Sequence, residues 1–326
     1  MTARGGAAVV ISPVAGEPRL VDPDRPLVGL EDQALTRGDG VFETMHVLDG
    51  DAYKFAAHHD RLCSSARSAG LPAPTAATCR AALRMALDAA GPGSRDASLD
   101  LGAEHAVKLS ISRGVPGGTP WAWLTASPVP ATTFAARRDG LRVLLLERGH
   151  DPAEDADLPW LLPGVKTLSY AVNMAAVRHA RENGAQDAVF MTSSEHRILE
   201  GATSSVICAR TAPGAPPTLV TPEPSRGILP GTSQARIFET ARSHGWAVDH
   251  GPLHPQDLLR ADAVWLTSSV RLAVPVTAVD GHPVPTDPEL TRTLTGFLVG
   301  RRLASPSARQ QTGPAPDDAA GGLTAR

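Results

Sequence analysis

The alternation of apolar and polar side chains predicts several strands in the first half of the chain. In "HAVKLSISRG", Val107, Leu109 and Ile111 alternate with polar or small residues, which is the period of a half-buried strand. The runs "AAVVIS" and "VFETMHVLDGDAYKF" also predict strands, and Asp49-Gly50 predicts a hairpin turn inside the second run.

Helical spacing appears in two segments between these strands. "AHHDRLCSSARSAGL" places Leu62, Ala66 and Ala69 on one face and stops at Gly70, and "TAATCRAALRMALDAAG" is a second amphipathic segment. His58 and His59 of the first segment are expected on its solvent side. The later stretch "AWLTASPVPATTFAARRDG" predicts a strand followed by a Pro/Thr/Ala-rich linker near residues 128–140.

The second half of the chain repeats the mixture of strands and helices. "LRVLLLERG", "DAVFMT", "SSVICAR" and "AVWLTS" predict strands, whereas "TLSYAVNMAAVRHARENG" and "GTSQARIFETARSHG" predict helices. We therefore expect an α/β (α+β) protein with two domains, 1–130 and 131–303. The polar, Pro/Gly-rich tail at 304–326 is expected to be disordered.

Composition excludes several classes of function. The chain is 42% hydrophobic and 20% charged with a net charge of −3, and no basic stripe with interleaved aromatics suggests nucleic-acid binding. Its three cysteines are widely spaced without a CxxC pair, which argues against a disulfide framework or a zinc site. The Asp-rich run "GHDPAEDADLPW" lacks the spacing of a metal-binding loop. With no long apolar segment, we expect a soluble cytoplasmic protein that binds neither membrane nor metal.

The rarity of lysine singles out one position. Of 31 basic residues only Lys54, Lys108 and Lys166 are lysine, and Lys166 follows a Trp-Leu-Leu-Pro-Gly run at an expected helix start. Unlike arginine, a desolvated lysine can lose its proton near neutral pH and then act as a base or form a Schiff base. The alternative is a lysine with no role beyond its charge.

Three more segments carry groups of complementary chemistry. "RILEGATSSV" supplies Glu200, which could equally be a surface carboxylate in a turn. "GILPGTSQARIF" places Gly231, Thr232 and Ser233 at a helix start, where free N–H groups and hydroxyls suit a phosphate, or where a simple N-cap would stand. "WLTSSVRLAVPV" ends a strand with a polar segment that includes Ser268 and Ser269.

Together these groups match the needs of pyridoxal 5′-phosphate: an amine for the aldehyde, a carboxylate for the pyridine nitrogen and donors for the phosphate. Over residues 20–300 the chain resembles the class IV, or fold-type IV, pyridoxal-phosphate enzymes. The resemblance lies in "TRGDGVFETMHVLDGDAYKFAAHHDRL", "KTLSYAVNMAAVRHARENGAQDAVFM", "LEGATSSV", "GILPGTS" and "ADAVWLTSSVRLAVPVTAVDG". This family includes branched-chain aminotransferases, D-amino-acid aminotransferases and 4-amino-4-deoxychorismate lyases.

The resemblance implies a role for each matching residue. Lys166 would bind the cofactor covalently and shuttle protons, and Glu200 would pair with the pyridine nitrogen. Phe42 and Glu43 would line the substrate side. The remaining cofactor contacts would be Arg61 at the phosphate, with Gly231, Thr232, Ser233, Ser268, Ser269 and Tyr170. The implied architecture is a smaller N-terminal α/β domain and a larger C-terminal domain, with the cofactor in the cleft between them, in a homodimer.

The resemblance is closest to the lyases, which release pyruvate from aminodeoxychorismate to form 4-aminobenzoate, a folate precursor. D-amino-acid aminotransferases carry an Arg-x-His carboxylate trap, whereas "SRGVPGGTPWAWL" has no arginine after Arg113 and no histidine. Trp121 stands about where some lyases place a tyrosine, so Arg113 and Trp121 are expected near the substrate. The alternatives are an aminotransferase acting on D-amino or branched-chain amino acids, and a degenerate family member without catalytic activity.

Overall fold

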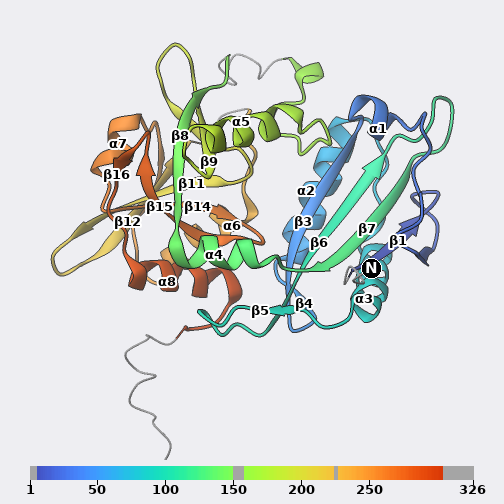
Figure 1. Cartoon of the computed structure of the whole chain (residues 1–326), viewed down its shortest axis with the longest axis horizontal. Coiled ribbons are helices and arrows are strands. Elements are labelled where there is room, and N and C mark those ends of the chain that lie inside the picture. Colours follow the sequence, from blue (N-terminus) through green and yellow to red (C-terminus); the bar gives the residue numbers. More distant parts are fainter. Residues whose placement is uncertain (1–5, 150–157, 224–226, 304–326) are drawn as a thin grey trace, which may run out of the picture.

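The computed structural model describes residues 6–149, 158–223 and 227–303. Most of the Asp-rich run and the whole of the tail at 304–326 lie outside the described residues, so the predictions made for them are not addressed. Two β-sheets with helices packed on them form the described part, which confirms the expected α/β class (Figure 1). Among the described helices, none is long and apolar enough to cross a lipid bilayer.

The first sheet has seven strands in the order β2-β1-β7-β6-β3-β4, with β5 paired to β6. Its strands are antiparallel throughout. Their bounds are β1 Ala7–Ile11, β2 Pro18–Val21, β3 Gly40–Leu48, β4 Asp51–Ala52, β5 Ser94–Arg95, β6 Ala103–Ser112 and β7 Trp121–Pro128. The predicted alternation in β6 is confirmed, because Val107, Leu109 and Ile111 are all buried in one core cluster.

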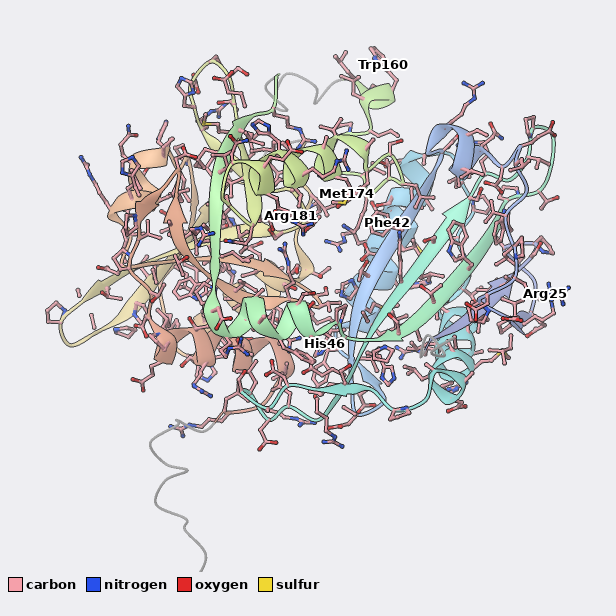
Figure 2. All side chains as sticks on the ribbon, viewed as in Figure 1. Arg25, Phe42, His46, Trp160, Met174 and Arg181 are labelled. Carbon is pink, nitrogen blue, oxygen red and sulfur yellow. The ribbon has the colours of Figure 1, made fainter. Side chains whose placement is uncertain are left out.

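Helices α2 (Phe55–Ser68) and α3 (Ala76–Ala90) cover one face of this sheet. The apolar residues Leu62, Ala66 and Ala82 join the core that the two helices share with the strands. The other face of β3 turns toward the second sheet, as Phe42 and His46 show in Figure 2. Two opposite faces of one strand therefore serve two purposes, a core on one side and the edge of a cavity on the other.

The second sheet has nine strands in the order β10-β9-β8-β15-β14-β11-β12-β13, with β16 paired to β15. It is mixed, because β8 pairs in parallel with both β9 and β15, and β12 pairs in parallel with β13. The bounds are β8 Leu141–Glu147, β9 Asp187–Met191, β10 Ile198–Gly201, β11 Ser205–Ala212, β12 Ala215–Pro222, β13 Val248–Gly251, β14 Ala263–Ser268, β15 Leu272–Val279 and β16 His282–Pro283.

The helices around the second sheet are α5 (Ala171–Glu182), α6 (Thr232–Ser243), α7 (Pro255–Arg260) and α8 (Pro288–Val299). Helices α6 and α8 pack against each other and on the sheet, where they bury Trp265 and Phe238 almost completely. The described part also contains two shorter helical elements. Helix α1 (Gln33–Arg37) lies between β2 and β3 along the chain, and the 3-10 helix η2 (Pro159–Leu161) lies between β8 and α5. The apolar periodicity predicted α6 but gave no sign of α1.

The structure changes two of the predicted boundaries. The expected linker contains helix α4 (Ala131–Asp139), which runs from the first sheet to the second in Figure 1. Arg137 on this helix is buried and donates to Glu104 and Asp96, so a charge hidden from solvent explains why this connection is ordered. Helix α5 begins at Ala171 rather than directly after Lys166.

Candidate active site between the two sheets

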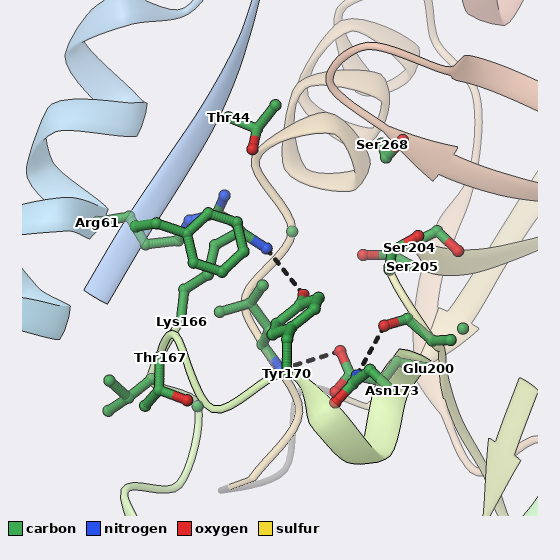
Figure 3. A pocket seen from close by; sticks show the side chains of 18 of the residues that line it. Thr44, Arg61, Lys166, Thr167, Tyr170, Asn173, Glu200, Ser204, Ser205 and Ser268 are labelled. Atoms are coloured by element: carbon green, nitrogen blue, oxygen red, sulfur yellow. Dashed lines mark hydrogen bonds between the residues drawn. The ribbon is translucent and has the colours of Figure 1, made fainter. Parts of the chain in front are cut away.

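A cavity of about 620 Å³ lies where the two sheets meet. The first sheet and α2 contribute Phe42, Thr44 and Arg61, and the rest of its wall comes from the second half of the chain. Figure 3 shows Lys166 and Glu200 reaching into it, with Tyr170 between them in this view. The cavity also holds, from the predicted cofactor set, Gly231, Thr232, Ser233, Ser268 and Ser269.

Lys166 lies on an extended segment that is bonded to strand β3. The Phe42 N–H donates to the Lys166 carbonyl at 2.9 Å, and the Leu168 N–H donates to the Gly40 carbonyl at 2.8 Å. This pairing, which bridges Val41 and Thr167, holds the segment out of a helical conformation and is why α5 starts later than predicted. The lysine is thereby fixed to the first sheet while the following helix belongs to the second.

The Lys166 amine is prepared for chemistry by its surroundings. Its Nζ donates to Tyr170 Oη at 3.1 Å and lies 4.5 Å from the centroid of the Phe42 ring. Burial lowers the pKa of Lys166 to about 8, with the Arg61 charge adding to the shift and two nearby carboxylates opposing it. Roughly 10–20% of this amine is therefore neutral at about pH 7 to 7.4, far more than for a solvated lysine, and a nucleophile or base acts through that neutral form.

Glu200 projects from β10 into the same cavity. Its Oε1 accepts from Arg148 Nη1 at 3.4 Å, and its Oε2 accepts from the Leu229 N–H at 3.3 Å. Burial raises the pKa of Glu200 to about 7, although the charges of Arg148 and Lys166 act in the opposite direction. A protonated ring nitrogen bound beside Glu200 would offset the free-energy cost of burying this carboxylate, because it would place a cation next to it.

The start of α6 forms the polar end of the cavity. Its N-cap residue Gly231 makes no side-chain capping bond, so the first-turn N–H groups stay available for an anion. A Cβ atom at Gly231 would displace Ser205 Oγ, so glycine lets both the helix start and this hydroxyl line the cavity. Lys54 Nζ donates to Ser233 Oγ at 2.9 Å and adds a cation to this end.

Arg61 reaches the polar end of the cavity from α2. It donates through Nε and Nη2 to the two oxygens of Glu43, at 2.6 and 2.8 Å, and through Nη1 to the Pro230 carbonyl at 2.8 Å. These bonds fix the guanidinium in the cavity wall, which Thr232 also lines.

Two expectations near Arg61 are wrong. Glu43 does not line the cavity: it is 1% exposed and binds Arg61 and His58 beneath the wall. Successive side chains of a strand point to opposite faces, so Phe42 and Glu43 cannot share the substrate side. His58 is not on the surface either, because its Nδ1 lies 2.8 Å from Glu43 Oε2 and its Nε2 lies 3.0 Å from Ser269 Oγ.

Arg113 and Trp121 also lie outside the cavity wall of this chain. Arg113 donates to Asp39 at 2.6 Å and to the Ala69 carbonyl at 2.6 Å, and Trp121 donates to Asp32 at 2.8 Å. Asp32 caps α1, the short helix that the sequence did not reveal. Both side chains therefore hold the loops around α1 together, and the expectation that they face the substrate is not met here.

Sequence reasoning missed several residues of the cavity. Thr44 lies two positions after Phe42 on the same strand face, a signal that period-two alternation carries. Asn173 donates to the Ala202 carbonyl at 2.7 Å and so ties α5 to the wall, a long-range contact without a local signature. Lys54 does not line the cavity but binds the lining residue Ser233, and the rarity of lysine in this chain could have drawn attention to it.

The residues present fit pyridoxal 5′-phosphate. The cavity contains the Lys166 amine, whose pKa is lowered, and the buried Glu200 carboxylate, and its polar end has open N–H groups with Arg61 and Lys54 nearby. Ser204 Oγ, which lines the cavity, is buried and has no hydrogen-bond partner among the described residues. Such a hydroxyl is costly unless a ligand or water completes its bonding.

Comparison with known proteins agrees with this geometry. The model of the family described as "Amino-transferase class IV" matches residues 40–279. A protein of Mycobacterium tuberculosis named "Bifunctional aminodeoxychorismate lyase / D-amino acid transaminase" is 42% identical over 273 residues, covering 82% of this chain and 91% of the relative.

Two solved structures share the fold over most of the chain. A hypothetical aminotransferase from Mycobacterium tuberculosis, in its PLP-bound form, has 39% identity and a TM-score of 0.78, covering 90% of this chain and 99% of the other. A fold IV transaminase from Curtobacterium pusillum has 36% identity and a TM-score of 0.79, covering 91% and 98%. The chain therefore belongs to the class IV aminotransferase family, whose members use pyridoxal 5′-phosphate.

Proposed function

We propose that this protein is a 4-amino-4-deoxychorismate lyase, which releases pyruvate and forms 4-aminobenzoate. The observation that carries the proposal is the cavity around Lys166 combined with the loop after β6. That loop contains no Arg-x-His pair, and its single arginine, Arg113, is bonded to Asp39 outside the cavity wall. The name of the relative from Mycobacterium tuberculosis supports the same reaction.

Pyridoxal 5′-phosphate, when bound, supplies the electron sink for the reaction. Lys166 is the residue that would hold it and also the base, because its neutral amine can take the ring proton from the carbon that bears the substrate nitrogen. Loss of that proton and cleavage of the ether bond make the ring aromatic, and the enolpyruvyl group leaves as an enolate that takes up a proton to become pyruvate. Tyr170 Oη, 3.1 Å from Nζ, keeps the amine directed into the cavity.

The other residues position and neutralise charge. Glu200 would balance the protonated ring nitrogen, and Arg61, Thr232 and Ser233 would hold the phosphate. Ser269 would complete the phosphate end opposite α6, with its hydroxyl oriented by His58. These assignments rest on the chemistry of the groups and on their common cavity.

The second candidate is transamination of a D-amino acid. The name of the same relative includes "D-amino acid transaminase", and the similar protein from Curtobacterium pusillum is described as a transaminase. In that reaction the Lys166 amine would move a proton from the substrate α-carbon to the cofactor carbon. Both reactions need the same amine and the same electron sink, so the wall that faces the substrate decides between them.

We also propose that two copies of the chain associate in the cytoplasm. Large apolar side chains are exposed on α1, η2 and α5 and in the loop before α1, which lie along one edge of the molecule in Figure 1. They include Leu30 at 86%, Trp160 at 71% and Val172 at 68% exposure. Exposed apolar surface of this kind is typical of subunit interfaces. Sedimentation of the purified protein tests the dimer directly.

The lyase proposal is tested by comparing two reactions of one preparation. The protein is incubated with pyridoxal 5′-phosphate, reduced with borohydride and digested, and mass spectrometry should find the cofactor on the peptide that contains Lys166. Release of pyruvate and 4-aminobenzoate from aminodeoxychorismate is then compared with keto-acid exchange from D-alanine or leucine. Faster or equal exchange in the second assay would replace the lyase by the transaminase.

A further inference from the structure

Lys108 lies on the sheet face that forms one wall of the cavity. It stands directly opposite Thr44 in the pairing of β3 with β6, and directly opposite residues of an antiparallel pair share a face. Thr44 lines the cavity (Figure 3), so Lys108 extends the same wall outward by one strand. Lys108 is exposed to solvent, so it lies at the rim of the cavity and is not buried under its wall.

The amines of two lysines contact the Phe42 ring. Lys108 Nζ lies 4.4 Å from the ring centroid and Lys166 Nζ lies 4.5 Å from it. Since each nitrogen is within 4.5 Å of one point, the two are separated by no more than twice that distance. Consider a substrate whose amine lies at the position of Lys166 Nζ. The flexible Lys108 side chain can reach an anionic group on that substrate.

The cations around the cavity differ in what they already bind. Arg61 is paired with Glu43, and Arg148 is paired with Glu200. By contrast, among the described residues no carboxylate forms an ion pair with Lys108. Partial burial lowers the pKa of Lys108, and the nearby Lys166 adds to this shift. A cation that has no carboxylate partner in the protein favours a bound carboxylate.

We propose that Lys108 binds the carboxylate of the amino substrate and thereby selects carboxylate-bearing amines. The inference rests on the proposed function and deepens it, since the substrates of both candidate reactions carry a carboxylate near the reacting amine. It also explains why the wall needs no Arg-x-His pair, because the cation comes from the strand instead of the following loop. Lys108 is a specificity-determining residue in this arrangement, and Phe42 is the surface along which the substrate lies between the two lysines.

The test uses two ligands of the same shape, 4-aminobenzoate and its uncharged analogue 4-aminobenzamide. Their dissociation constants are measured by calorimetry on the cofactor-loaded wild type and on three variants: Lys108→Met, Lys108→Arg and, as a control, Arg138→Met. Arg138 is exposed on α4 and paired with Asp139, away from the cavity. We expect the wild type, Lys108→Arg and Arg138→Met to prefer the carboxylate by about tenfold or more, as one charge-assisted hydrogen bond provides.

In Lys108→Met that preference should disappear while affinity for the amide is kept, and the visible absorption of the bound cofactor should be unchanged. A wild type without preference for the carboxylate, or a Lys108→Met variant that retains the preference, would overturn the assignment. Equal weakening of both ligands would also overturn it, because that result indicates a structural role. Failure of the lyase proposal shows up separately, as absence of 4-aminobenzoate production, and leaves the ratio of the two dissociation constants interpretable.

Discussion

Glu43 and Arg61 form a doubly bonded ion pair directly beneath the cavity, with N–O distances of 2.6 and 2.8 Å. Glu43 is almost fully buried, whereas Arg61 reaches the cavity surface. The carboxylate therefore sets the direction in which the guanidinium points. Because His58 binds the same carboxylate and also contacts Ser269, one buried acid organises both sides of the phosphate end.

Replacing this acid should weaken both the fold and cofactor binding. Glu43→Gln leaves Arg61 and His58 with a neutral partner in a buried place, and loss of one member of a buried pair costs about 3–5 kcal/mol. We expect a lower melting temperature and a higher dissociation constant for pyridoxal 5′-phosphate, measured by thermal unfolding and by titration. Glu239→Gln, an exposed glutamate on α6, serves as the control.

The same pair predicts an acid-dependent loss of stability. Burial alone would raise the pKa of Glu43, but hydrogen bonds from His58 and Arg61 lower it to about 2 from 4.5. A carboxylate whose pKa is depressed in the folded state stabilises fully above its unfolded pKa and progressively less below it. The stability difference between wild type and Glu43→Gln should therefore shrink as pH falls from about 5 toward 2. A difference that stayed constant over this range would contradict the role of the charge.

The pH dependence of cofactor attachment should report on Lys166. Its pKa is lowered to about 8, and only the neutral amine attacks an aldehyde, so the attachment rate should rise through pH 8 and level off above it. Stopped-flow absorbance of apoprotein mixed with pyridoxal 5′-phosphate measures this rate. Lys166→Arg should show no attachment at any pH. A midpoint near 10 would indicate that the lysine is solvated and the cavity open.

The sequence predicted the parts of the fold that depend on local patterns. The alternation in β6 and the apolar spacing in α2 were sufficient, because burial of one face decides both elements. The rarity of lysine singled out Lys166, and the family resemblance implied roles for Lys166, Glu200 and Thr232, which the fold brings to one cavity. Local rules alone could not have joined residues so far apart along the chain.

Where prediction failed, a distant contact overrode a local preference. His58 was predicted on the solvent side of its helix, but it shares a face with Leu62 and is held inside by its bonds to Glu43 and Ser269. Arg113 pairs with Asp39, more than seventy positions earlier in the chain, and so turns away from the cavity. Pairing with β3 likewise delays the start of α5. Two errors were avoidable, because strand alternation already separates the side chains of Phe42 and Glu43, and helical spacing already places His58 on the face of Leu62.

Glu200 should matter more for transamination than for the lyase reaction. Glu200→Gln removes the negative charge that keeps the ring nitrogen protonated, which weakens the electron sink. The lyase reaction gains driving force from aromatisation of its product, so it depends less on that sink. We expect a larger loss of kcat for D-alanine exchange than for 4-aminobenzoate release in the same preparation. Comparable losses in both assays would show that the two reactions make equal demands on Glu200.

The last prediction concerns Lys54, whose Nζ donates to Ser233 Oγ at the start of α6. Burial lowers the pKa of Lys54 to about 7, and the charges of Arg61 and Arg236 add to the shift. A phosphate bound beside Ser233 interacts most favourably with the protonated lysine. The charge of Lys54 should therefore strengthen phosphate binding below pH 7, and this contribution to the affinity should decline as pH rises above 7.

Pyridoxamine 5′-phosphate is the suitable probe for Lys54, because it lacks the aldehyde and cannot attach to Lys166. Calorimetry at pH 6.5 and 8.5 should show that Lys54→Met weakens binding about tenfold at the lower pH, the scale of one hydrogen bond to a charged group, and less at the higher pH. Titration of the ligand phosphate affects both proteins equally and cancels in the ratio. Since Lys54 has a φ of 57°, methionine replaces it without a new backbone cost. An equal ratio at both pH values would mean that Lys54 acts through packing against Ser233 rather than through its charge.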